Sequence, residues 1–205
     1  RTAPYRIVHG TIGTTTVAAR SDESGRFILR FPPQPGSTLP QTLTVKEMRS
    51  GKTVTAENLL FGEVWLAGGQ SNMELPLREL PERLAEAQAL LKSTPKIRML
   101  NVGKCAETGG RDEITGSWSI PTPETIGNWS AVGFFFAAKL SAELNVPVGI
   151  ISSNWGATNL EAWSTRASLL QYPETAKMLA EYDEAASRPE VWETLINDNS
   201  GAQAR

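Results

Sequence analysis

The feature that most restricts the fold is a nearly unbroken apolar run that ends abruptly in two glycines. Residues 59–67 read LLFGEVWLA, and Gly68 and Gly69 follow. An apolar run of this length, closed by a turn signal, is typical of a strand that is buried on both faces of a parallel sheet covered by helices. The sequence therefore predicts an α/β layer architecture from this point onward.

The segments after this strand alternate as a parallel sheet requires. Residues 81–92 have the apolar spacing of a helix, and residues 96–102 and 148–152 form two further strand candidates. The chain after Trp163 is mostly helical in pattern. Strand–helix–strand order favours a parallel sheet. Three strands make a thin sheet, however, so we expect the α/β domain to be incomplete in this chain.

A second helix is expected between the last two of these strands. Ser130 is suited to cap its N-terminus, and Pro147 follows its end. Its expected buried stripe consists of large apolar residues, namely Val132, Phe135, Phe136, Leu140 and Leu144.

The N-terminal part of the chain has a different character. Short runs with β-branched or aromatic residues at 5–8, 14–19, 26–31 and 43–45 alternate with Gly and Pro turn signals. They predict a small β-sandwich or an appendage sheet. We therefore divide the chain into a β-rich region, 1–58, and an α/β region, 59–205.

Composition excludes several classes of function. The 205 residues include 20 Lys and Arg against 22 Asp and Glu, which gives no electrostatic reason to expect a nucleic acid or an anionic membrane as partner. No apolar run is long enough to span a bilayer. Cys105 is the one cysteine and stands in no catalytic motif. There is no metal-ligand spacing of Cys or His, so no metal and no organic cofactor is expected.

The stretch from Gly68 to Glu74 is the most informative for chemistry. Ser71 follows the apolar strand, and α/β sheets place their sites at the carboxyl ends of their strands. A serine that opens a helix after a sharp turn has an exposed hydroxyl, and its backbone N–H can face a developing negative charge. From spacing alone, Ser71 is either such a nucleophile or an ordinary helix cap. The elbow G-x-S-x-G is not present, because Met73 replaces its last glycine.

Three stretches resemble a known family. Residues 61–73 (FGEVWLAGGQSNM) resemble the signature of the sialate O-acetylesterase family, within the SGNH-type serine esterases. Residues 145–163 (NVPVGIISSNWGATNLEAW) resemble the family segment in which a strand ends in a Trp-Gly-Gly-Thr turn and leads to Glu-Ala-Trp. Residues 129–137 (WSAVGFFFA) resemble its aromatic helix. The resemblance implies an SGNH-like three-layer α/β/α fold with a parallel sheet.

The resemblance also implies roles for individual residues. Ser71 matches the nucleophile, and its N–H and that of Gly156 match donors to the oxyanion. Gln70, Asn72 and Trp155 flank these donors and are expected to line the acyl or sugar pocket, although Trp155 is equally suited to core packing. For Gly156 the alternative is a plain turn glycine. Glu161 and Trp163 belong to the family pattern, and helix capping and core packing are favoured for them.

The chain departs from the family pattern in two ways. Ala157 stands where a second glycine is usual, which restricts the backbone beside Gly156. The family's Gln-Gly-Glu block and its late Asp-x-x-His block, which carries the base, do not occur here. His9 is the one histidine and lies far before Ser71, so it is a poor candidate for the base. We therefore expect a second chain or a C-terminal half to supply the Asp-x-x-His block.

The sequence thus predicts a carbohydrate O-acetylesterase that hydrolyses acetyl esters of a sugar such as sialic acid, with an O-acetylated sugar as substrate. Two alternatives stay open: a non-catalytic carbohydrate-binding or structural fragment of the same fold, and an acetyl xylan esterase. Acetylated glycans occur mainly outside the cytoplasm or in degradative compartments, so a secreted, periplasmic or lysosomal location is expected.

Overall fold

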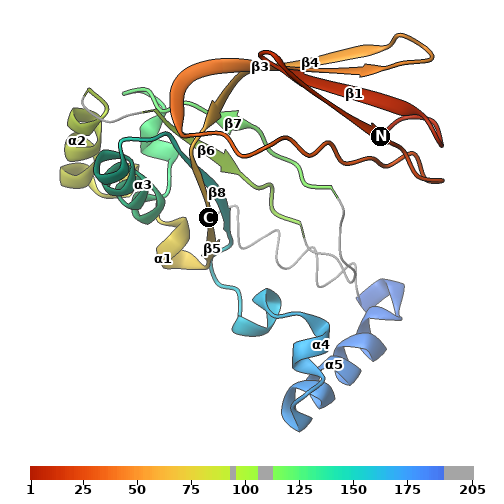
Figure 1. Ribbon diagram of the computed structural model, residues 1–205. Coiled ribbons are helices and arrows are strands. Elements are labelled where there is room, and N and C mark those ends of the chain that lie inside the picture. The colour runs from red at the N-terminus through yellow and green to blue at the C-terminus, as the bar shows by residue number, and fades with distance from the viewer. Residues whose placement is uncertain (93–95, 106–112, 192–205) are drawn as a thin grey trace.

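A computed structural model describes residues 1–92, 96–105 and 113–191 as a mixed α/β structure (Figure 1). Its strands are β1 (Ile7–Ile12), β2 (Thr15–Arg20), β3 (Ser37–Glu47), β4 (Thr53–Phe61), β5 (Glu63–Gly69), β6 (Ile97–Asn101), β7 (Trp118–Ser119) and β8 (Val148–Asn154). Its α-helices are α1 (Ser71–Glu74), α2 (Pro81–Leu90), α3 (Ala131–Leu144), α4 (Arg166–Leu169) and α5 (Pro173–Ala186), and its 3-10 helices are η1 (Leu77–Glu79), η2 (Ile126–Asn128) and η3 (Leu160–Trp163).

The first four strands form one antiparallel sheet in the order β2-β1-β3-β4. The prediction of a strand at residues 26–31 is wrong, because this segment forms no strand in the structure. Instead it lays Leu29 and Phe31 over Gly10 of β1, where an added Cβ would lie 2.6 Å from Leu29 Cδ1. In the described residues this region is a single sheet with a covering segment, and it does not form a sandwich.

The second sheet has the order β5-β8-β6-β7, in which β5, β8 and β6 run parallel and β7 is antiparallel to β6. The parallel strands confirm the predicted sheet type. The single strand predicted for residues 59–67 is wrong, because residues 59–61 end β4 and residues 63–69 form β5. Gly62 lies between the two sheets, and a Cβ there would be 2.0 Å from the Pro147 carbonyl oxygen. Only glycine fits such a close approach of backbones.

Helix α3 packs on β8 and β6 and, with α2, covers one face of the second sheet (Figure 1). Ser130 caps it as predicted, since its Oγ accepts from the N–H of Gly133 at 3.0 Å. The predicted buried stripe is wrong in part: Val132, Phe136 and Leu144 are more than 40% exposed, whereas Phe135 and Leu140 are partly buried against the core. The buried residues of α3 are mostly small, namely Ala131, Gly133, Phe134, Ala137, Ala138 and Ser141.

The other face of this sheet is open in the described residues. Val64 and Leu66 of β5 are 61% and 70% exposed, so the expectation of a strand buried on both faces is wrong here. Trp118 of β7 lies on the same face as Val64, because both approach the position where a Cβ would stand on Gly149. Among the strands of the described ranges, β5 pairs with β8 alone, and none of them lies on its second edge.

The two sheets are joined by side chains as well as by Gly62. Lys96 donates to the Thr38 carbonyl oxygen at 2.7 Å, and Arg98 of β6 donates to Asn58 of β4 through both the carbonyl and the side-chain oxygen. The division of the chain after residue 58 stays a prediction; β4 itself runs to Phe61. Across the described ranges, none of the helices has the length and apolar character needed to cross a membrane.

Candidate active site

Ser71 stands at the carboxyl end of β5, where the sequence places it. Strand β5 ends at Gly69, and Ser71 opens α1, a helix of one turn. The residue is exposed. Gln70 caps this turn, and its Oε1 accepts both the Ser71 N–H, at 3.1 Å, and the Ser71 hydroxyl, at 2.8 Å. The serine is therefore accessible, and its hydroxyl hydrogen is held by an amide oxygen.

The turn after β8 lies directly beside Ser71. In the parallel register Gly69 pairs with Asn154, and the Trp155 N–H donates to the Gly69 carbonyl oxygen at 3.0 Å. A Cβ added at Gly156 would lie 3.4 Å from Ser71 Oγ. The structure thus brings together Ser71 and Gly156, two residues that are 85 positions apart in the sequence. Their closeness is what the proposed pair of oxyanion donors requires.

Ala157 continues this turn in the left-handed conformation, with φ of 62°. For a residue with a Cβ this region is strained, and such strain persists only where the surroundings fix the backbone. From the resemblance to the family we expected Ala157, which stands where a glycine is usual, to restrict the backbone. In the structure the turn keeps the conformation that glycine adopts most easily.

Two residues that the sequence analysis did not single out complete the cluster. Glu74 Oε2 accepts a short hydrogen bond from the Gly156 N–H, and Glu74 Oε1 pairs with Lys104 Nζ at 2.5 Å. Lys104 Nζ also lies 5.6 Å from the centre of the Trp155 ring. The spacing of Ser71 and Glu74, one helical turn apart, was a signal in the sequence. Nothing local indicated Lys104, which comes from the loop after β6.

The charge of Glu74 is stabilised by these contacts. Burial raises the pKa of its carboxyl, but the hydrogen bonds from Lys104 and from the Gly156 N–H, together with the charge of Lys104, outweigh it and hold the pKa below its ordinary value. The carboxylate therefore stays ionised at neutral pH and is a strong acceptor for the Gly156 N–H.

The other predicted site residues lie around this cluster. Gln70 and Asn72 are exposed beside Ser71, and Trp155 is half-buried with Lys104 over its ring. Trp163 Nε1 donates to Thr158 Oγ1 at 2.8 Å, and Thr158 Oγ1 in turn donates to the Trp155 carbonyl oxygen at 2.7 Å. Trp163 therefore fixes the turn rather than filling a core. The pocket-lining roles of Gln70, Asn72 and Trp155 stay predictions.

No histidine pairs with Ser71 among the residues that the structure describes. His9 lies on β1 of the antiparallel sheet, opposite Ala18 on β2 and Lys46 on β3. The hydroxyl of Ser71 is directed to Gln70 instead. Among the residues that the structure describes, no three His, Cys, Asp or Glu side chains gather as a metal site would require.

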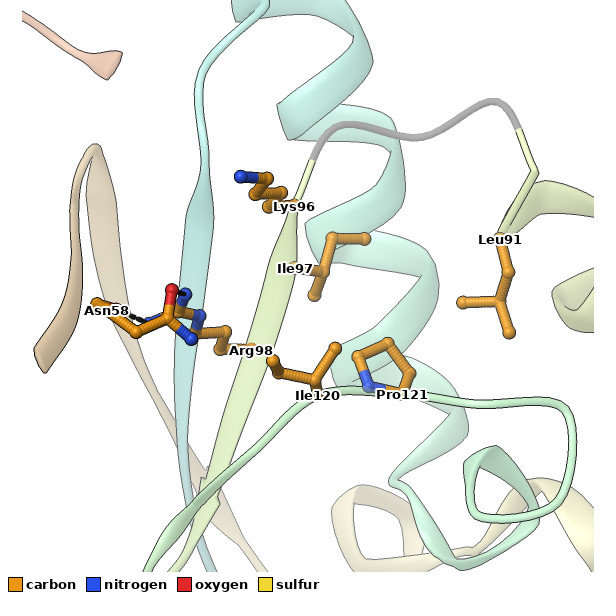
Figure 2. A pocket seen from close by; sticks show the side chains of 7 residues that line it. All are labelled: Asn58, Leu91, Lys96, Ile97, Arg98, Ile120 and Pro121. Carbon is orange, nitrogen blue, oxygen red and sulfur yellow. Dashed lines mark hydrogen bonds between the residues drawn. The ribbon is translucent and has the colours of Figure 1, made fainter. Parts of the chain in front are cut away.

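A cavity of about 380 Å³ opens at the other end of the second sheet (Figure 2). It lies at the start of β6, between Arg98, which is bonded to Asn58, and an apolar side formed by Leu91, Ile97, Ile120 and Pro121. Ser71 follows the carboxyl end of β5, so this cavity is separate from the serine cluster.

The structure is that of an α/β protein in which an exposed serine follows a parallel strand and lies beside a glycine turn on the neighbouring strand. The comparisons agree with this class. The chain is 30% identical to the sialate O-acetylesterase of Pongo abelii over 166 residues, which cover 76% of this chain, and 30% identical to that of Homo sapiens over 163 residues, also 76% of this chain. The mouse protein of the same name is 32% identical over 68% of the chain.

A solved structure gives the same result in three dimensions. The crystal structure of a carbohydrate acetylesterase from Xanthomonas citri matches with a TM-score of 0.74 and 31% sequence identity, over 82% of this chain and 38% of that one. No protein-family model matches the chain. These matches confirm the resemblance to the sialate O-acetylesterase family. The chain spans 31% of the length of the Pongo and human relatives, so most of their polypeptide has no counterpart in it.

Proposed function

We propose that this chain carries the nucleophile of a carbohydrate O-acetylesterase. The observation that carries the proposal is the contact between Ser71 and the Gly156 turn at the carboxyl ends of two paired parallel strands. The similarity to sialate O-acetylesterases and to a carbohydrate acetylesterase supports the class of reaction and an O-acetylated sugar as substrate.

The chemistry follows from the positions of these groups. Ser71 Oγ attacks the acetyl carbonyl carbon and gives its proton to a base, and the N–H groups of Ser71 and Gly156 hold the oxyanion. The bond from the carbonyl carbon to the sugar oxygen then breaks, and that oxygen takes the proton from the base. Water then gives a proton to the base and attacks the acetyl carbon, the bond from that carbon to Ser71 Oγ breaks, and Oγ takes the proton back as acetate leaves. Each step uses acid–base and hydrogen-bonding groups, and the proposal includes no metal or organic cofactor.

The base comes, in this proposal, from polypeptide outside these 205 residues that carries an Asp-x-x-His block. The match covers 31% of the length of the relatives, and a block of this kind could lie in the remaining part. The free edge of β5 and the open apolar face around Val64, Leu66 and Trp118 support this, since unpaired edges and large apolar faces are normally covered. A strand added in parallel on β5 would end beside Ser71. Helices on the open face would complete a three-layer, SGNH-like fold.

The proposed substrate also bears on location. Acetylated glycans occur mainly in extracytoplasmic or degradative compartments, so we place the protein in a secreted, periplasmic or lysosomal setting. Within the esterase class, the shape of the completed pocket decides between sialate and xylan esters.

The test is turnover of p-nitrophenyl acetate and of an O-acetylated sugar by the purified protein, with intact mass and a denaturing gel to identify every polypeptide present. Ser71→Ala should abolish turnover, by a factor of at least about 10³. Ser187→Ala, an exposed serine after α5, is the matched control and should leave the rate unchanged. Equal rates for Ser71→Ala and the native protein would refute the nucleophile. A folded chain that binds acetylated sugar without turnover would favour the carbohydrate-binding alternative.

A further inference from the structure

Glu74 links three loops that follow three different parallel strands. It lies on α1 after β5, its Oε1 pairs with Lys104 after β6, and its Oε2 accepts the N–H of Gly156 after β8. Lys104 closes the set by lying over the Trp155 ring. We call this group of four residues, Glu74, Lys104, Trp155 and Gly156, the Glu74 clasp.

The clasp connects the Gly156 turn to the helix of the serine. Other hydrogen bonds hold the turn from elsewhere: Trp155 N–H donates to Gly69, and Trp163 holds Thr158. Among the hydrogen bonds of the described residues, the one from Gly156 to Glu74 alone joins this turn to α1. Because Ser71 and Glu74 share that single helical turn, the bond fixes the separation of Ser71 from Gly156.

The turn also needs such an anchor. Ala157 holds a left-handed backbone conformation that a Cβ disfavours, so an unanchored turn would relax away from it. The hydrogen bond to Glu74 is charge-assisted, and Lys104 keeps the carboxylate ionised and in place. Side-chain exposures of 33% for Glu74 and 34% for Lys104 leave the pair partly shielded from water.

We propose that Glu74 is a positioning residue, which holds the Gly156 turn against Ser71 so that the Gly156 N–H stays close to the serine hydroxyl. This rests on the proposed function. When the oxyanion forms, the Gly156 N–H passes from Glu74 Oε2 to the oxyanion and the Ser71 N–H passes to it from Gln70 Oε1, while Lys104 retains the Glu74 carboxylate through Oε1. Glu74 thus keeps the strained turn in its reactive shape while no substrate is bound.

The kinetic test compares Glu74→Ala and Glu74→Gln in the protein together with whatever polypeptide supplies the base. Glu74→Ala should lower kcat about 10- to 100-fold with little change in KM, because the misplaced donor acts on the transition state. Glu74→Gln keeps an oxygen acceptor without charge and should fall between Ala and native. Glu79→Ala, an exposed carboxylate five residues further on, is the control and should have native kinetics. An unchanged or raised kcat in Glu74→Ala would overturn the proposal, and a rise would mean that the carboxylate only blocks the donor.

A second measurement does not depend on turnover. In a ¹H–¹⁵N spectrum, the Gly156 amide proton should resonate downfield in the native protein and move upfield in Glu74→Ala, and Glu79→Ala should leave it in place. If the Gly156 amide proton has the same chemical shift in Glu74→Ala as in the native protein, the hydrogen bond between Gly156 and Glu74 does not exist in solution. If Ser71→Ala leaves turnover intact, the proposed function fails and the positioning role with it, whereas the amide shift still reports whether the contact exists.

Discussion

Replacing Ala157 by glycine should stabilise the protein, against the usual effect of adding a glycine. The left-handed backbone of Ala157, with φ of 62°, costs a residue with a Cβ about 1–2 kcal/mol. Glycine removes that cost but loses about 0.5–1 kcal/mol through the greater freedom of the unfolded chain. The difference leaves a net gain in the free energy of unfolding of about 0.5–1 kcal/mol, which for a chain of this size raises Tm by about 1–4 °C.

The assay is urea unfolding followed by circular dichroism, with thermal scans of the same samples. Ala180→Gly, at an exposed position inside α5, is the matched control, because its backbone is helical and the same change should cost about 1 kcal/mol. Opposite signs for the two variants would isolate the backbone conformation as the cause. If Ala157→Gly were also destabilising, the turn beside Gly156 would not hold the left-handed conformation in solution, and the argument for its anchoring by Glu74 would lose its main support.

Two further predictions concern a helix cap and a titration. Ser130→Ala should lower the free energy of unfolding by about 1 kcal/mol, measured by urea unfolding, because the Gly133 N–H at the buried start of α3 loses its acceptor. The pKa of Glu74 is lowered in the folded protein, so its contribution to stability is present above the ordinary glutamate pKa and disappears as pH falls through the lower folded value. A pH series of unfolding should therefore show Glu74→Gln less stable than native at neutral pH and the gap closing in acid; a gap that is constant with pH would contradict this.

The sequence predicted the order of elements better than their burial. Residues 81–92, 96–102 and 148–152 were expected as helix, strand and strand, and α2, β6 and β8 lie there. These elements have strong periodic patterns and clear end signals. The buried stripe of α3 was wrong in part, since Val132, Phe136 and Leu144 are exposed, whereas small residues such as Gly133, Ala137 and Ala138 are buried. Which face of a helix is buried depends on how closely the helix packs on its sheet, and the sequence of the helix alone does not give that distance.

The break at Gly62 is a second feature that the sequence pattern did not predict. Residues 59–67 have the composition of one buried strand, yet they belong to two sheets, and Gly62 between them lies against the Pro147 backbone. An isolated glycine within a strand pattern is a recognised sign of close backbone approach. The sequence could thus have indicated an interruption, but the partner that makes it necessary lies 85 residues away.

Some residues of the candidate site could be predicted from the sequence, and others could be found only in the structure. Ser71 was indicated by the strand that precedes it, because α/β sheets place their sites at the carboxyl ends of their strands, whereas Gly156 was assigned only through the resemblance to the family. Their contact through β5 and β8 follows from that rule once the strands are neighbours. Lys104 has no such signal: it acts through Glu74 and Trp155, and only the order β5-β8-β6 brings its loop to the other two. The role of Lys104 depends on the order of the strands, so only the structure could reveal it. Lys104 keeps the Glu74 carboxylate in place, and Glu74 in turn positions the Gly156 turn.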